Sequence, residues 1–149
     1  MFRVVRLILG AGLAAGFAFP AVAHASPAEE SMVGEINDAR RAHGVPALHE
    51  SPLLSESASS YSRYMLARDY FGHLSSVRTS DKFTLKGEIL AWHSGSNPRV
   101  GPTFGRWMRS GGHRAVILHP KMRYVGAGMA RGSLSGTGAT VWTIHFGRH

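Results

Sequence analysis

Cysteine is absent from this 149-residue chain, and acidic residues are few. Without cysteine the chain can form no disulfide, no thiolate metal site and no cysteine nucleophile. The 9 acidic residues are outnumbered by 17 lysines and arginines, which gives a formal net charge of +8. With 44% hydrophobic and 17% charged residues, the composition is typical of a globular protein and excludes a disordered one. The length fits one ordinary domain.

Long hydrophobic segments are also scarce, and the single uncharged apolar run covers residues 7–19. It is too short for a membrane-spanning helix, which takes about 20 apolar residues. Two arginines precede the run, and the sequence A-H-A follows it at 23–25. This order is typical of a secretory signal peptide. We predict that residues 1–25 are removed on export to the periplasm or medium, and that residues 26–149 are the mature domain with no membrane span.

Several signatures of enzymes and of nucleic-acid binding are missing. The sequence has no G-x-S-x-G, no GxxxxGK[ST] and no H-E-x-x-H, so serine hydrolases, nucleotide hydrolases and zincins lose their usual support. It has no block of five or six consecutive basic residues either, and we predict no specific nucleic-acid partner.

Hydrophobic periodicity predicts helices in the first part of the chain and strands toward the end. Helices are expected at 29–43, at about 52–69, from 97–102 to about 110, and at 113–118; strands are expected at 88–92, 125–130 and 141–146. The Gly111-Gly112 pair is expected to end the third helix, and residues 131–138 to connect the last two strands as a hairpin. The fold class predicted is α+β, one domain in which helices cover an antiparallel sheet.

Five short motifs follow one another along the chain. They are N-D-A-R-R-A-H-G at 37–44, Y-F-G-H at 70–73, G-E-I-L at 87–90, W-M-R-S-G-G-H-R at 107–114, and the two strands that begin at Val125 and Trp142. Together they resemble the CAP superfamily (cysteine-rich secretory protein, antigen 5, pathogenesis-related 1) in its cysteine-free bacterial form. The resemblance covers residues 31–147. It implies an α-β-α sandwich with a central antiparallel sheet and a cleft on one face.

Members of that family place two histidines and one or two glutamates around the cleft, and the matching residues here are His73, Glu88 and His113. Two imidazoles and one carboxylate suit a divalent metal, zinc first, and leave a coordination position open for water or ligand. The same three groups could instead act as a proton relay. Taken singly, each also has a structural interpretation, as a helix cap, a strand residue or a first-turn residue.

The chain departs from the family pattern at two polar positions. Ile89 stands where the family has asparagine, and Ser110 stands where many members have a second cleft glutamate. The smaller carboxylate set is expected to weaken metal affinity. His93 and His145 are considered as substitute ligands, although a packed or surface histidine is the commoner role for such residues.

Positive charge is concentrated in the second half of the chain. The residues concerned are Arg99, Arg106, Arg109, Arg114, Lys121, Arg123 and Arg131. A solvated cationic face is the ordinary interpretation, and an anion-binding rim beside the His cleft is the alternative. If an anionic envelope polymer binds here, the candidate residues are Arg106, Arg109, Arg114, Lys121 and Arg123.

Three functions from different classes remain open. The first is a secreted, monomeric binding module whose cleft holds a divalent metal and a small or lipidic ligand. The second is a metal-dependent hydrolase of envelope peptide or glycan, with His73, Glu88 and His113 as its catalytic residues. The third is an envelope protein that interacts through its basic face. We favour the first and leave enzymatic activity undecided.

Overall fold

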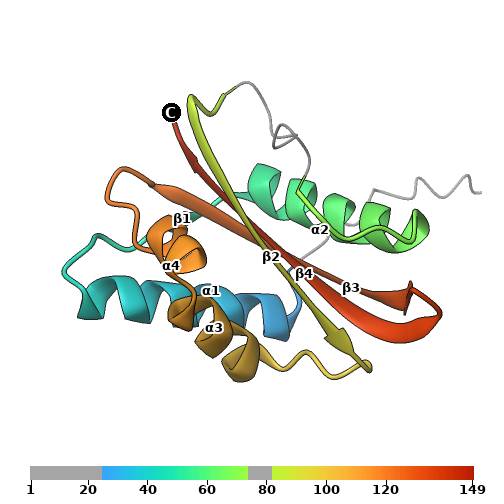
Figure 1. Ribbon diagram of the computed structural model, residues 1–149. Helices are drawn as coiled ribbons and strands as arrows, with labels where there is room; N and C mark the ends of the chain where they lie inside the picture. The colour runs from blue at the N-terminus through green and yellow to red at the C-terminus, as the bar shows by residue number, and fades with distance from the viewer. Residues whose placement is uncertain (1–24, 74–81) are drawn as a thin grey trace, which may run out of the picture.

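The computed structural model describes residues 25–73 and 82–149, so all but the last residue of the predicted signal peptide lies outside the described part. Helices and strands are arranged in three layers (Figure 1). In chain order they are α1 (Pro27–Ala42), β1 (His49–Glu50), α2 (Pro52–Ala67), β2 (Leu85–Ser94), α3 (Val100–Arg109), α4 (Gly111–Ile117), β3 (Tyr124–Leu134) and β4 (Thr137–Arg148).

The sheet has the strand order β1-β3-β4-β2. β3 and β4 form a long antiparallel hairpin that turns at Ser135 and Gly136, where φ is 51° and 73°. Two consecutive residues with positive φ match the twist of a two-residue hairpin turn. β2 pairs antiparallel with the other side of β4, and β1 adds two residues parallel to β3. β2 is therefore an edge strand, and one of its sides faces the helices that follow it.

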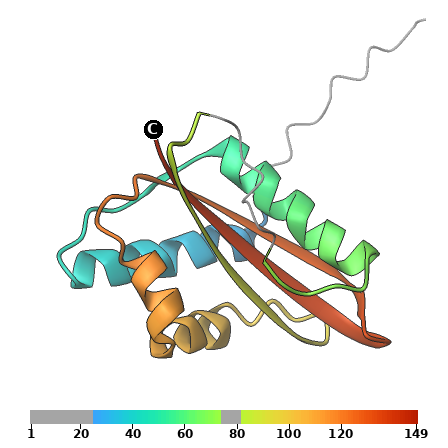
Figure 2. The same cartoon turned by 45° about the horizontal axis from the view of Figure 1, so that its top comes forward.

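α2 covers one face of the sheet, as the turned view shows (Figure 2). It lies directly on β3, because a Cβ atom on Gly128 would be 2.1 Å from the backbone nitrogen of Ser59. Gly126 makes an equally close approach one turn earlier in α2. Only glycine permits this spacing between a helix and a strand. Tyr61 and Met65 of α2 are buried against β2 and β4.

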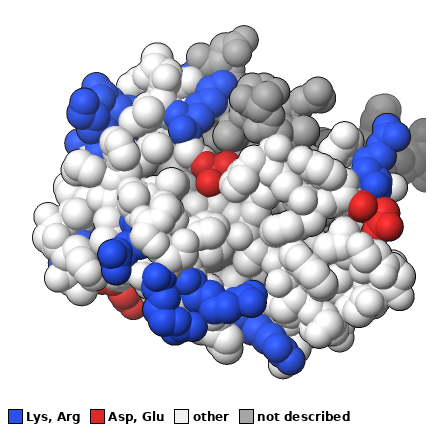
Figure 3. Space-filling view, viewed as in Figure 1, with Lys and Arg blue, Asp and Glu red and all other residues white. Residues whose placement is uncertain are grey.

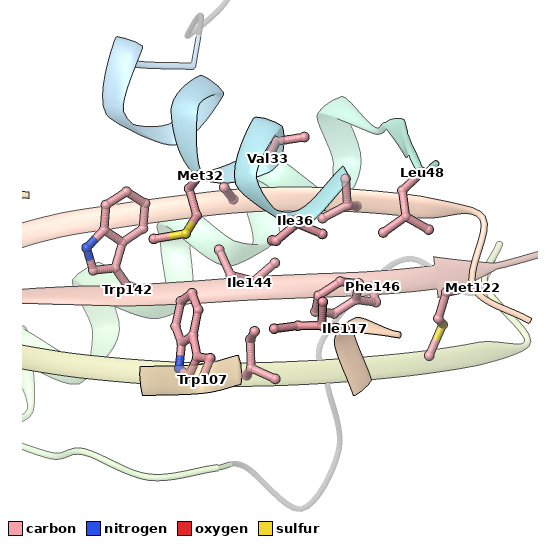
Figure 4. Packing of buried hydrophobic residues seen from close by; sticks show 13 residues of the cluster. Met32, Val33, Ile36, Leu48, Trp107, Ile117, Met122, Trp142, Ile144 and Phe146 are labelled. Carbon is pink, nitrogen blue, oxygen red and sulfur yellow. The ribbon is translucent and has the colours of Figure 1, made fainter. Parts of the chain in front are cut away.

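α1, α3 and α4 cover the opposite face, and the main core lies between them and the sheet. In Figure 4, Ile36 of α1 and Ile117 of α4 lie over Phe146 of β4. The alternation of side chains along a strand explains why Trp142, Ile144 and Phe146 face this core together. The full buried cluster is Met32, Val33, Ile36, Leu48, Ile89, Trp107, Ile117, Met122, Val125, Ala127, Trp142, Ile144 and Phe146.

Arg40 of α1 is fully buried, although its side chain is charged. Its Nε donates to the Pro46 carbonyl at 2.8 Å, and its Nη1 donates to the carbonyls of Ile117 at 2.6 Å and His119 at 3.1 Å. Nη2 donates to the Met122 carbonyl at 3.4 Å. The guanidinium therefore joins the loop after α1 to the segment between α4 and β3. Burial lowers the pKa of Arg40 from its usual value.

The predicted α+β class and the sandwich of helices and sheet are confirmed. Some boundaries were wrong: Gly111-Gly112 begins α4, because Ser110 is already extended (φ −91°, ψ 119°) and separates the two helices. The strand predicted at 88–92 runs from Leu85 to Ser94. The parallel pairing of β1 was not predicted, because two residues carry no periodic signal. Within residues 25–73 and 82–149, no helix is long and apolar enough to cross a membrane.

Candidate functional site

The register of β2 and β4 places Glu88 directly opposite His145. Side chains of paired residues lie on the same face of a sheet, and here this is the face that α2 covers. His73 comes after the end of α2 and returns to the same place. Its Nδ1 is 2.7 Å from Glu88 Oε1, while His145 Nε2 is 2.8 Å from Glu88 Oε2. Glu88, His73 and His145 thus come from three separate segments of the chain, and the carboxylate of Glu88 joins the two imidazoles.

The three side chains differ sharply in exposure. The side chain of Glu88 is 5% exposed and that of His145 is 2% exposed, whereas that of His73 is 58% exposed. His145 also stacks on Tyr61 of α2, with ring centroids 6.4 Å apart. Its Nδ1 is the single buried side-chain N or O atom in the described residues that has no hydrogen-bond partner. The buried His145 therefore holds the carboxylate of Glu88 in place, and this carboxylate in turn orients the exposed His73.

His113 lies in the first turn of α4, in the region of His73. Its Nδ1 is 2.7 Å from the hydroxyl oxygen of Ser110, the residue that precedes α4. The pKa of His113 is lowered from its usual value, first by burial and second by the charge of a protonated His73. Both histidines line the same cleft. A neutral His113 can accept a proton or bind a metal ion.

A cleft of about 460 Å³ lies where the two imidazoles meet the free side of β2. Trp107 of α3 donates its indole N–H to the Leu90 carbonyl at 2.9 Å, and Arg106 Nη2 is 3.4 Å from the Trp92 carbonyl. These contacts attach α3 to the edge strand. The residues that line the cleft are Phe71, Gly72, His73, Leu90, Ala91, Trp92, Arg106, Trp107, Ser110 and His113. Glu88 is not among them.

Residues 33–146 match the family described as "Cysteine-rich secretory protein family" (CAP). The chain belongs to this family. It is 28% identical over 124 residues to the protein YkwD of Bacillus subtilis, an alignment that covers 79% of this chain and 46% of YkwD. The chain thus spans less than half the length of this curated relative.

Solved structures share the CAP fold. An outer surface protein from Borrelia burgdorferi has a TM-score of 0.66 and 19% identity, over 82% of this chain and 92% of that one. An extracellular protein of Bacillus anthracis with an SCP domain has a TM-score of 0.64 and 21% identity, over 82% of this chain and 40% of that one. NaASP2, solved with Zn²⁺, has a TM-score of 0.60 and 11% identity, over 82% of this chain and 80% of that one. Identities this low show the fold alone.

The two departures from the CAP pattern have different consequences. Ile89 is 1% exposed and belongs to the main core on the face opposite Glu88, so its side chain does not reach the carboxylate. Ser110 lacks a carboxylate, but its hydroxyl contacts His113 directly. Serine is therefore a polar partner of the histidine at this position of the cleft.

His93 and His145 were considered as substitute ligands, and the structure separates them. His145 is joined to the site through Glu88, as a buried residue beneath it. The sequence signal for this was its place on the strand face of Val141 and Thr143. His93 lies away from the His73–His113 cleft, with its ring nitrogens near the carbonyls of Ser94 and Pro98.

In the part of the chain that the structure describes, no group of three or more His, Asp or Glu side chains has the arrangement of a metal site. Both oxygens of Glu88 are hydrogen-bonded to imidazoles, those of His73 and His145. The arrangement leaves two imidazoles, those of His73 and His113, whose Nδ1 atoms are already bound and whose Nε2 atoms are the ring positions left for a ligand.

Proposed function

We propose that this protein is an exported CAP-domain binding module, and that its cleft binds a divalent cation together with a small or lipidic ligand. The cation would bind to Nε2 of His73 and of His113. Export rests on the signal-peptide pattern of residues 1–25 and on the extracellular character stated for the Bacillus anthracis relative.

The observation that carries this proposal is the anchoring of both imidazoles through Nδ1. Histidines that bind metals usually hydrogen-bond their second ring nitrogen to a carboxylate or another polar group, which fixes the ring and raises its basicity. Glu88 does this for His73, and Ser110 does it for His113. Glu88 is thus assigned to the support of the site, where the sequence predicted a direct ligand.

The donor chemistry fits zinc better than magnesium. Neutral imidazole is a preferred zinc ligand, whereas magnesium prefers carboxylate and water oxygens. When bound, the ion would supply a Lewis-acidic centre with open positions for an oxygen atom of the ligand. The aromatic and aliphatic side chains of Phe71, Leu90 and Trp92 would hold the apolar part of that ligand.

The hydrolase alternative is less well supported by the geometry. It requires a carboxylate that can act as base, yet Glu88 has a 5% exposed side chain and uses both oxygens on imidazoles. The binding module requires only the two histidines and the cleft beside them.

Calorimetric titration of the mature, untagged protein with zinc chloride tests the proposal. We expect one site per chain, and loss of the binding in a variant with His73→Ala and His113→Ala. A variant with His43→Ala and His49→Ala is the matched control, because both of these side chains are exposed and lie outside the cleft. Equal zinc binding by the wild type and the His73/His113 variant would contradict the proposal.

A further inference from the structure

A second hollow, of about 300 Å³, lies along α3 beside the His73–His113 cleft. Three arginines line it: Arg99, which precedes α3, and Arg106 and Arg109 within it. Arg106 and Arg109 are three residues apart on α3, so their side chains lie on one side of the helix, and Arg99 stands before its first turn. Gly101 and Gly105, which also line the hollow, add no side chains to fill it. The rest of the lining is formed by His93, Pro102 and Thr103.

The charge of these arginines is uncompensated. From residue 82 to residue 149 the sequence has ten lysines and arginines but one acidic residue, Glu88, which is bound to two histidines. Within the described ranges, no carboxylate forms an ion pair with Arg99, Arg106 or Arg109. Figure 3 shows basic side chains gathered over α3, at the lower edge of the molecule. Neighbouring like charges repel, and a bound anion would remove this repulsion.

The number of guanidinium groups identifies the kind of anion. A carboxylate carries one charge and two oxygens, and a single guanidinium fork can bind both of them. Three guanidinium groups match an anion with more oxygens and more charge. A phosphomonoester has three terminal oxygens and a charge of about −1.5 to −2 at neutral pH. Arginine is well suited to phosphate because its planar fork can donate two parallel hydrogen bonds.

We propose that the hollow formed by Arg99, Arg106 and Arg109 binds the phosphate group of a phosphomonoester. Arg106 lines both this hollow and the cleft, so the two spaces share a wall. A phosphate in the hollow would leave an attached apolar group next to Trp92 and Phe71, which are 39% and 38% exposed. The ligand class is therefore a phosphate-headed amphiphile. Only the placement of its apolar part rests on the proposed function.

This site differs from the broader basic region that the sequence predicted. Arg123 directs its Nη1 to the carbonyls of Pro120 and Met122, outside the hollow. Arg114 and Lys121 do not line the hollow either. Of the five residues considered for a polymer site, Arg106 and Arg109 line the hollow, together with Arg99 of the wider basic set.

Side-chain NMR of the arginine Nε–H groups tests the site in the mature protein. The probes are inorganic phosphate and a short-chain phosphatidic acid kept below its micelle concentration. We expect both to shift the Arg99, Arg106 and Arg109 signals. In a variant with Arg99→Gln and Arg109→Gln, the affinity for both probes should fall at least about tenfold. Each hydrogen bond to a charged phosphate that is lost lowers the affinity by about this factor.

The charge-matched control carries Arg63→Gln and Arg114→Gln, two exposed arginines outside the hollow. It should bind as the wild type does. Equal losses in the two variants would show diffuse electrostatic attraction and overturn the proposal, as would the absence of binding by the wild type. All variants remove exposed side chains, and thermal unfolding verifies that they are folded.

The two probes distinguish the source of the phosphate. Tighter binding of phosphatidic acid than of inorganic phosphate, lost on Trp92→Ala, indicates a lipid headgroup; equal affinities indicate a free phosphate or a small ester. Both results support the site. The His73→Ala/His113→Ala variant should retain phosphate binding, so failure of the zinc site and failure of the phosphate site are separable.

Discussion

Glu88 Oε2 and His145 Nε2 lie 2.8 Å apart across the β2–β4 pair, beneath a histidine that is exposed. An ionised carboxylate only accepts hydrogen bonds, so the proton of the contact is on His145 Nε2. A neutral ring then carries a bare acceptor at Nδ1, the atom that has no partner among the described residues. The surface imidazole of His73 is thus connected through Glu88 to the hydrophobic core.

Replacement of Glu88 by glutamine tests this connection. The amide keeps the size of the side chain but can accept from only one of the two imidazoles, so His73 loses its fixed orientation. We expect zinc affinity to fall about 10-fold to 100-fold, as is usual when a supporting partner of a metal-bound histidine is removed. Calorimetry measures this loss. Glu35→Gln, an exposed change on α1, should leave zinc affinity unchanged.

A second prediction concerns the contact between α2 and β3. Gly128→Ala would place a Cβ atom 2.1 Å from the backbone nitrogen of Ser59, and the helix must move to relieve the overlap. We expect the free energy of unfolding to fall by about 3 kcal/mol or more, at the upper end of overpacking effects. Urea unfolding measures it. Gly138→Ala is the control, since no atom lies within 4 Å of its added Cβ, and an equal loss there would contradict the argument.

Arg40 offers a third test. Arg40→Met keeps much of the side-chain volume but leaves the carbonyls of Pro46 and Ile117 without their donor. The carbonyls of His119 and Met122 still accept from the Met122 N–H and from Arg123 Nη1. Since each unsatisfied buried polar group costs about 1–3 kcal/mol, we expect a loss of at least about 2 kcal/mol in chemical unfolding. The neighbouring Arg41→Met removes an exposed arginine and should change stability by less than about 0.5 kcal/mol. Similar losses in the two variants would indicate that the buried network is not important.

Local patterns in the sequence predicted the α+β class and its main helices and strands, and the family motifs supplied the sandwich and the candidate site residues. The helical spacing of Met32, Val33 and Ile36 predicted the buried face of α1, and the alternation after Val141 predicted the two faces of β4. The motifs gave His73, Glu88 and His113. The motifs did not predict how these three side chains are oriented, because the orientation depends on the register of the strands. The pairing of Glu88 with His145 links positions 57 residues apart, and no local pattern specifies it.

Arg40 illustrates the same limit. Arg40 lies in the last turn of α1, where a basic side chain interacts favourably with the helix dipole. In the structure it is buried, and its carbonyl partners lie up to 82 residues away in sequence. Long-range hydrogen bonds to backbone carbonyls leave no trace in residue type or spacing.

Export is tested on the protein secreted by living cells. We expect removal of residues 1–25, because the basic start, the short apolar run and the A-H-A site are the features that a signal peptidase recognises. Intact-mass measurement of the exported protein should show a chain that begins at Ser26. Replacement of Ala23 and Ala25 by bulky residues should block cleavage. A mature protein that retains Met1 would contradict the prediction.

The final prediction concerns pH and rests on His113. Its pKa in the folded protein is lowered, mainly by burial, below the value of about 6.5 that holds in the unfolded chain. Between these two pKa values the unfolded chain binds a proton that the folded protein does not. The stability contribution of His113 is therefore complete above about pH 6.5 and decreases as the pH falls toward the folded pKa. Relative to His113→Gln, the wild type should lose free energy of unfolding between pH 7 and pH 5, as measured by urea unfolding. An NMR titration of the His113 ring gives the midpoint directly, and a midpoint above 6.5 would reverse the sign of the effect.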